Sequence, residues 1–118
     1  MSPAKKLIAP QLRGSVKSAQ MLLKALIDGK KITNHENSKY ATNSVKDILG
    51  DLKRDYGLKL LDEWETNPRT DTRYKKYYIN KSGMAYARLL LNYFITKDKA
   101  ILAKLNIRAR EPKKWIKY

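Results

Sequence analysis

Two stretches in the first half of the chain carry apolar residues at helical spacing. The first lies between Ser15 and Gly29, and its apolar residues recur three or four positions apart. The second lies between Ser44 and Gly57 and repeats this pattern. Serine is favoured at the start of a helix and glycine just after its end, so both stretches are predicted helices with defined boundaries.

The segment between these helices predicts a strand and a further short helix. Ile32 is an isolated apolar residue, which indicates a short strand. Thr33 and Glu36 have the spacing of a capping box, so a helix over residues 34–40 is expected to follow. Residues 42–43 then break the chain before the next helix. Helices separated by so short a turn are typical of helix-turn-helix domains.

Residues 57–79 separate their charges, with Asp62, Glu63 and Glu65 in the first half and cations in the second. Folding this stretch back on itself brings acids opposite cations and apolar residues opposite apolar ones. The predicted pairs are Leu60–Tyr78, Leu61–Tyr77, Asp62–Lys76, Glu63–Lys75, Trp64–Tyr74 and Glu65–Arg73. Opposed pairs of both kinds stabilise antiparallel strands. The stretch therefore predicts a β-hairpin with a loop over residues 66–72.

The C-terminal third of the chain is predicted to be helical and then irregular. A helical region begins at Ser82, is apolar nearly all round over residues 84–95, and gives way to a second helix over 97–105. The basic stretch 106–118 contains a proline and is expected to be irregular. The apolar helix either covers the core of its own domain or forms a homodimer interface through residues 84–105.

Composition points to a polyanionic partner. The 118 residues hold 26 Lys and Arg against 11 Asp and Glu, a formal net charge of +15. Nucleic acid is the first candidate and an anionic membrane surface the second. Residues 32–57 hold four cations and four acids, whereas residues 82–118 hold nine cations and two acids. This distribution predicts a neutral segment that reads sequence, flanked by ends that bind phosphate.

Several classes of protein are not expected. The chain has no cysteine, which excludes thiolate catalysis and thiolate metal sites, and its single histidine, His35, excludes sites with two histidine ligands. No glycine-rich phosphate loop or serine-nucleophile motif occurs. We therefore expect no enzyme, cofactor, metal or small-molecule substrate. Neither a secretion signal nor an apolar stretch long enough to span a bilayer is apparent, so a cytoplasmic location without membrane association is expected.

The run LLKALIDGKKITNHENSKYATNSVKDILGDLKRDYGLKLLDEWE, followed by RYKKYYIN, resembles a winged helix-turn-helix family common in phages and other mobile elements. The shared pattern is an apolar helix ending in Gly29, the pair Ile32-Thr33, a third helix ending in Leu52-Lys53-Arg54 before Gly57, and an aromatic-rich strand over Arg73–Tyr78. It covers about residues 20–80. Two departures are Asn37, where the family has a small apolar residue, and Ala41, where it often has glycine.

The resemblance implies an α+β winged helix-turn-helix fold, with three helices, a β-hairpin wing and a C-terminal helical extension. The expected parts are a basic arm over residues 1–14, the winged domain over 15–81 and the extension with its basic tail over 82–118. The resemblance also implies sequence-specific binding of double-stranded DNA, with the third helix in the major groove. The protein would bind a replication origin or operator in a bacterial host cell, and it could be the DNA-binding piece of a larger protein.

Candidate DNA contacts on the third helix lie at its start and on and beside the face opposite its apolar stripe. They are Asn43 and Ser44 at the N-terminus, Asp47, Gly50 and Arg54 on that face, and Lys46 and Lys53 flanking it. Asn43 has the chemistry to pair with adenine, and Lys46 or Arg54 with guanine. Gly50 would let the backbone approach the groove. Asp47 and Asp51, predicted on the same face, would repel phosphate unless one of them accepts a hydrogen bond from cytosine.

Further candidates lie in the hairpin and the tail. Arg69, at the tip of the loop, is the one hairpin cation without an acid in the predicted register, whereas Lys75 and Lys76 face acids and rank lower. Arg73, which faces Glu65, is a further candidate. The tail contributes Arg108, Arg110, Lys113 and Lys114, which lie near Trp115 and Tyr118. Such a mixture suits an arm that tracks phosphates or stacks on single-stranded bases.

Each site has a plainer interpretation. Asn43 and Ser44 suit a turn and a helix cap, and the tail suits a solvated terminus. Two other functions also stay open. One is a protein–protein interaction module on a winged-helix scaffold, docking through residues 89–95. The other is binding of single-stranded nucleic acid through the tail.

Overall fold

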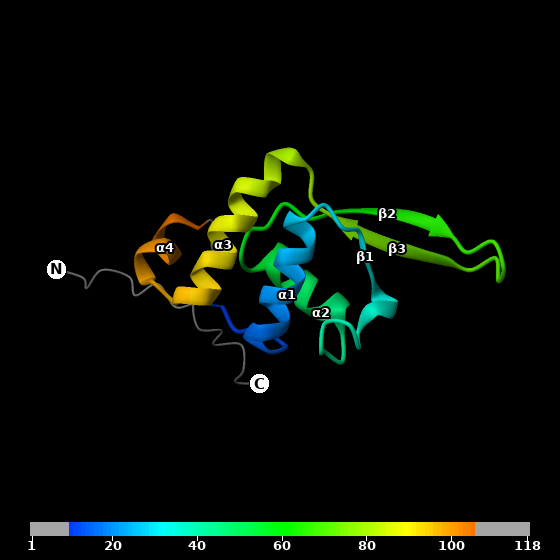
Figure 1. Ribbon diagram of the computed structural model, residues 1–118, viewed down its shortest axis with the longest axis horizontal. Helices are drawn as coiled ribbons and strands as arrows, with labels where there is room; N and C mark the ends of the chain where they lie inside the picture. Colours follow the sequence, from blue (N-terminus) through cyan, green and yellow to red (C-terminus); the bar gives the residue numbers. More distant parts are fainter. Residues whose placement is uncertain (1–9, 106–118) are drawn as a thin grey trace, which may run out of the picture.

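The chain folds into helices that pack beside one end of a small antiparallel sheet (Figure 1). The structure is a computed structural model that describes residues 10–105. Its elements in chain order are α1 (Val16–Ile27), β1 (Ile32–Thr33), the 3₁₀ turn η1 (Asn34–Glu36), α2 (Val45–Arg54), β2 (Leu61–Thr66), β3 (Arg73–Tyr78), the 3₁₀ turn η2 (Lys81–Gly83), α3 (Met84–Thr96) and α4 (Lys99–Lys104). The predicted α+β class is confirmed by the four α-helices and three strands of the described residues.

The sheet has the order β1-β3-β2, so β3 lies in the middle. The two-residue strand β1 pairs with the last part of β3, close to the helices. The outer part of the β2–β3 hairpin extends well beyond the helices (Figure 1). Only the inner end of the hairpin therefore belongs to the core, and its outer end is free to present side chains to a partner.

The register of the hairpin differs by one residue from the predicted register, which is wrong. The observed pairs are Leu61–Tyr78, Asp62–Tyr77, Glu63–Lys76, Trp64–Lys75, Glu65–Tyr74 and Thr66–Arg73. The core explains the difference, because Tyr77 pairs with Ile32 in β1 and both side chains are buried. Alternate residues of a strand share a face, so Ile79 lies on the same face as Tyr77 and is buried with it. Leu60, on the other arm of the hairpin, is buried there too. Burial of this apolar face, and not the matching of charges, sets the register.

The hairpin loop follows from the same register. The backbone N–H of Asn67 donates to the carbonyl of Thr72 at 2.8 Å and closes a loop of residues 68–71. Asp71 closes the turn with a left-handed backbone, at φ 57°. The Asn67 side chain accepts from the backbone N–H of Arg69 at 2.9 Å, as asparagine often does in turns.

The predicted ends of α1 and α2 are confirmed. The side chains of Ser15 and Ser44 cap the two helices by accepting backbone hydrogen bonds. Gly29 and Gly57 follow the helices with φ of 83° and 75°, a left-handed conformation that costs glycine little.

The start of the C-terminal helices differs slightly from the prediction. Asn80, and not Ser82, caps the chain here, since its side chain accepts from the backbone N–H of Gly83 at 3.2 Å. α3 begins only at Met84, after the turn η2. The expected second helix is present as α4, and the Asp98 side chain caps it.

The helix predicted over residues 34–40 does not form. The capping box of Thr33 and Glu36 is present, but it opens only the single 3₁₀ turn η1. The Asn37 side chain is engaged elsewhere, because its oxygen accepts from the backbone N–H of Val45 at the start of α2, at 2.8 Å. Ala41 then adopts a left-handed backbone with φ 52°, where glycine would be unstrained. The two departures from the family pattern thus coincide with the irregular part of the chain.

The helix α3 covers the core of its own domain, as one of the two interpretations predicted. Ala87, Leu90 and Phe94 are buried against the cluster that α1 and α2 form. The amide of Gln20 in α1 donates to the carbonyl of Phe94 at 2.9 Å and joins the two helices. Ile95 points away and is 57% exposed. Over residues 10–105, no helix has the length and apolarity needed to cross a membrane.

Candidate nucleic-acid interface

The helix α2 buries one side and exposes a narrow stripe on the other. Lys46 and Lys53 are exposed on this stripe, and Gly50 lies between them and is partly exposed. Positions separated by three or four residues share a face of a helix, so these three residues lie in line. The two flanks of the stripe carry different chemistry and are described in turn.

One flank is a hollow of about 350 Å³ between α2, η1 and the hairpin, which we call the hairpin hollow. Its lining residues are Asn34, His35, Lys46, Trp64, Arg73, Tyr74, Lys75 and Tyr77. Basic and aromatic side chains therefore share one concave surface. Tyr77 stands at its inner end, where the hairpin meets the core, and Trp64 stands farther out along the same face of the sheet.

The cations of the hairpin hollow rest on an aromatic ring. The guanidinium carbon of Arg73 lies 4.9 Å from the centroid of the Trp64 ring, and the Nζ atom of Lys75 lies 5.1 Å from it. Trp64 is itself 55% exposed. Cation–π contacts at exposed sites contribute about 0.5–1 kcal/mol each, enough to order the side chains without neutralising them.

The predicted ion pairs of these two cations are wrong. Lys75 lies opposite Trp64, and Arg73 lies opposite Thr66. In the described part of the chain, no carboxylate is within ion-pair distance of either cation. The expected low rank of Lys75 as a DNA contact rested on an acidic partner that it does not have among the described residues.

Two of the three acids of β2, Glu63 and Glu65, pair on the opposite face of the hairpin. Glu65 accepts from Lys76, and this hydrogen bond raises the pKa of Lys76 above its ordinary value. Glu63 pairs with Lys31, whose Nζ atom lies 2.6 Å from its carboxylate oxygen. These two acids are thus accounted for by structural pairs, but by different ones from those predicted, while Asp62 is exposed opposite Tyr77.

Two polar groups lie at the base of the hairpin hollow. The His35 ring meets the Tyr74 ring edge-on, with 6.0 Å between the centroids. The side-chain oxygen of Asn34 is buried, and it alone among the described side chains is a buried polar atom without a hydrogen-bond partner. An amide in this position has bonding capacity left for a ligand that enters the hollow.

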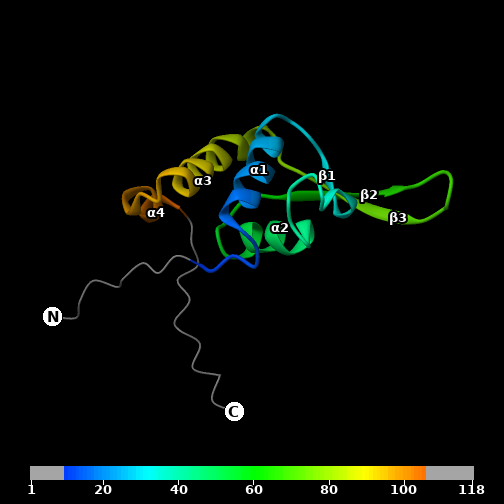
Figure 2. The same cartoon turned by 60° about the horizontal axis from the view of Figure 1, so that its bottom comes forward.

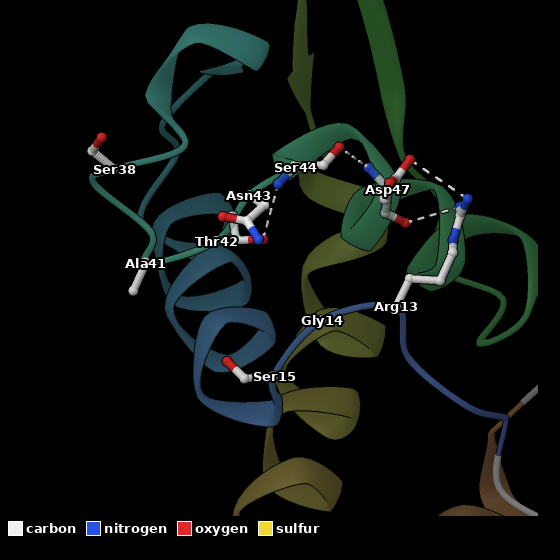
Figure 3. A pocket seen from close by; sticks show the side chains of 9 residues that line it. All are labelled: Arg13, Gly14, Ser15, Ser38, Ala41, Thr42, Asn43, Ser44 and Asp47. Atoms are coloured by element: carbon white, nitrogen blue, oxygen red, sulfur yellow. Dashed lines mark hydrogen bonds and ion pairs between the residues drawn. The ribbon is translucent and has the colours of Figure 1, made fainter.

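The second flank is a more open hollow of about 460 Å³ at the starts of α1 and α2, which we call the helix-start hollow. Its lining residues are Arg13, Gly14, Ser15, Ser38, Ala41, Thr42, Asn43, Ser44 and Asp47 (Figure 3). Asn43 is exposed at one side of this hollow and Arg13 reaches Asp47 at the other (Figure 3). Ser44 lines this hollow and also caps α2.

A charged network closes this second flank. Arg13 donates from its backbone N–H to Asp51 Oδ2 at 2.8 Å and from its Nε to Asp51 Oδ1 at 2.9 Å. Arg54 donates to Asp51 Oδ1 at 2.7 Å and to Asp55 Oδ1 at 3.0 Å. Asp51 is completely buried, so its predicted place on the outward face of the helix is wrong. Its charge is compensated by two guanidinium groups, and it cannot repel phosphate as an exposed acid would.

Two further candidates of α2, Arg54 and Gly50, are in contact with this network. The hydrogen bond to Asp55 raises the pKa of Arg54, and its guanidinium binds the carboxylates of Asp51 and Asp55. A Cβ atom at Gly50 would lie 3.5 Å from Arg13 Nη2. Gly50 is therefore partly exposed beside an arginine from another part of the chain, and its direct approach to a groove stays a prediction.

The remaining candidates are spread out. Arg69 is exposed at the tip of the hairpin loop, as predicted. Arg108, Arg110, Lys113 and Lys114 lie outside the described residues. The structure thus brings together Lys46, Arg73 and Lys75, and in a second group Asn43, Ser44 and Asp47.

Two residues of the interface were missed from the sequence. Arg13 was assigned to a flexible arm, although it binds a residue 38 positions away. Trp64 was treated only as a strand residue that packs against Tyr74. Its exposure could have been inferred from its position near the hairpin loop, far from the residues that form the core.

Comparison with known proteins gives no relative from which a function could be transferred. The chain matches no protein-family model, no curated protein and no solved structure. Within residues 10–105, no three His, Cys, Asp or Glu side chains converge as metal ligands would.

Proposed function

We propose that this chain is a winged helix-turn-helix domain that binds double-stranded DNA, with α2 as the recognition helix and the β2–β3 hairpin as the wing. In this arrangement α2 enters the major groove, and the wing lies along the adjacent backbone. Binding to a replication origin or operator of a phage or mobile element, as the resemblance implies, is part of the proposal. So is the possibility that the domain serves a larger protein.

The observation that carries the proposal is the set of cations in the hairpin hollow. Lys46 lies at the start of α2, while Arg73 and Lys75 lie on the hairpin, and all three line the same hollow. The two hairpin cations are ordered by an aromatic ring and keep their charge. A concave surface with ordered, uncompensated cations beside an exposed helix suits a DNA backbone next to the groove that the helix enters.

Base reading and phosphate binding fall to different residues in this proposal, except that Lys46 takes part in both. Asn43, Ser44, Lys46 and Lys53 lie where α2 would meet base edges. Arg69, Arg73 and Lys75 would hold phosphates, together with the tail cations of residues 108–114. Homodimer formation through residues 84–105 is a further proposal, to which Ile95 would contribute its exposed side chain.

The test is selection of bound sequences from a random duplex pool, followed by affinity measurements over a range of salt concentrations. We expect an enriched motif, and log K falling against log salt with a slope of about −0.9 for each phosphate neutralised. Lys46→Ala should weaken binding and make the slope shallower. Lys24→Ala, a matched change of an exposed lysine on α1, should leave both unchanged.

Other outcomes would point elsewhere. Salt-independent binding, or no duplex binding at all, would refute the proposal and favour a protein–protein interaction module. Preference for single strands, lost when residues 106–118 are removed, would instead favour the tail as a single-strand binder.

A further inference from the structure

Gly50 occupies the centre of the exposed stripe of α2, between Lys46 and Lys53. A recognition helix would present a side chain at such a central position, but glycine has none. The space is filled from another part of the chain, because the Arg13 guanidinium lies over the glycine, 3.5 Å from the place of a Cβ atom. The side chain at the centre of the stripe is therefore an arginine that comes from outside α2.

All three nitrogens of the Arg13 guanidinium lie near acceptors of α2, since Nη1 is also 3.5 Å from Asp47 Oδ1. Its Nε donates to the buried carboxylate of Asp51, and its Nη2 donates to the backbone carbonyl of Asp47 at 3.2 Å. Half of the Arg13 side chain is still exposed, at 50%. An arginine fixed by a buried carboxylate has lost most of its conformational freedom before any ligand binds, so little further entropy is lost on binding.

The segment that carries Arg13 is fixed independently. We call residues 10–14 the strap, which passes beside α2 before α1 begins (Figure 2). At one end the Tyr56 hydroxyl donates to the carbonyl of Pro10 at 2.5 Å, and burial raises the pKa of this phenol, so that it stays a donor. At the other end Gly14 lies against α2 so closely that a Cβ atom would be 2.5 Å from Ile48 Cδ1. The strap is thus held close to the helix at both ends.

The charge around Arg13 argues against a phosphate contact. Arg13 and Arg54 share their surroundings with three carboxylates, those of Asp47, Asp51 and Asp55. The network as a whole is not positive, so it offers little attraction to a polyanion. What the exposed edge of Arg13 still offers is directional N–H donors, which suit paired acceptors such as O6 and N7 of guanine.

We propose that Arg13 is a base-reading residue of this domain, presented by the strap at the place on α2 where Gly50 leaves room. Its target is the acceptor edge of a guanine in the major groove. The inference rests on the proposed function, since it takes α2 to be the recognition helix. Asp51 acts as a positioning residue, because it orients the guanidinium without facing the DNA.

The experiment compares the motifs that the wild type and two variants select from a random duplex pool. Arg13→Lys keeps the positive charge and loses the planar fork. Gly50→Gln leaves Arg13 in the chain but places a side chain where the guanidinium lies. Both should reduce preference for one base pair by about tenfold to a hundredfold, the range expected for loss of a bidentate contact, while binding to a scrambled duplex stays within about twofold.

Arg54→Lys is the matched control, because it also loses a contact to Asp51 but does not lie over Gly50. It should leave the preferred motif unchanged. Urea unfolding of all three variants separates loss of the fold from loss of base preference. Gly50→Gln is expected to fold well because glutamine favours helix more than glycine does.

The outcomes are distinct. A wild type that binds duplex DNA without selecting any motif overturns the proposed function and this inference together. A clear wild-type motif that persists in both Arg13→Lys and Gly50→Gln overturns the inference alone and makes the strap a structural tether. A motif that loses one guanine in both variants, and keeps it in Arg54→Lys, supports the inference.

Discussion

The two flanks of α2 both carry cations, yet they hold these cations in opposite ways. On the strap side, Arg13 and Arg54 are bound to the buried carboxylate of Asp51. On the hairpin side, Arg73 and Lys75 rest on the ring of Trp64. A carboxylate orders a cation and cancels its charge, whereas an aromatic ring orders a cation and leaves its charge in place.

The difference shows why a count of cations is a poor guide to a binding surface. The strap side is well ordered but nearly neutral, so it suits directional hydrogen bonds. The hairpin side is ordered and positive, so it suits a polyanionic backbone. Whether a given arginine contributes to stability, to phosphate binding or to base specificity depends on the partner that its side chain already has.

The largest expected effect is on the strap side. Asp51→Asn would remove the buried charge to which two guanidinium groups bind, and an amide cannot accept from all their donors. We expect the free energy of unfolding to fall by about 2–3 kcal/mol, measured by urea denaturation. Asp62→Asn, which changes an exposed acid on β2, is the control and should have little effect. Equal stability of the two variants would mean that the network is not needed to hold the strap.

The hairpin side should respond in binding and not in stability. The double variant Arg73→Ala, Lys75→Ala removes the two ring-bound cations, so the slope of log K against log salt should become shallower by about 1.8. Lys31→Ala with Lys76→Ala is the matched pair, since both of these lysines already bind glutamates on the other face. The comparison fails if the matched pair changes the slope as much as Arg73 and Lys75 do.

The smallest expected effect concerns the pairing of charges across the hairpin. A double-mutant cycle on Glu65 and Lys76 should reveal a coupling energy, because these side chains are bonded. A parallel cycle on Glu63 and Lys75 should reveal none, because Lys75 lies against Trp64 and Glu63 pairs with Lys31. Thermal unfolding of the single and double variants gives both values. Coupling in the second cycle and none in the first would restore the register predicted from charge matching.

Features set by neighbours in sequence were predictable. The ends of α1 and α2 follow from local caps and glycines, and the hairpin follows from the acidic and basic halves of residues 57–79, which a loop joins. Its register was not predictable from the hairpin alone, because it is set by burial against Ile32 in a different strand. The prediction of a helix over residues 34–40 failed for a related reason, because the Asn37 side chain accepts a hydrogen bond from the start of α2.

The candidate site was predicted only in part for the same reason. Lys46, Lys53 and Asn43 are exposed, as their spacing indicated. Arg13 and Asp51 were misplaced because their contact spans a long stretch of chain, and helical periodicity alone gave no sign that a carboxylate would be buried. A buried aspartate needs a partner, and nothing local to α2 identifies a partner that lies in the strap.

The order of the sheet leaves one side of β2 unpaired in the part of the chain that the structure describes. A free strand edge is a template on which a second copy of the same chain can add its own strand. Two β2 edges brought together would oppose Asp62, Glu63 and Glu65 of each copy, and like charges placed opposite one another destabilise a ladder. In a chain as basic as this one, the acidic strand thus protects against aggregation.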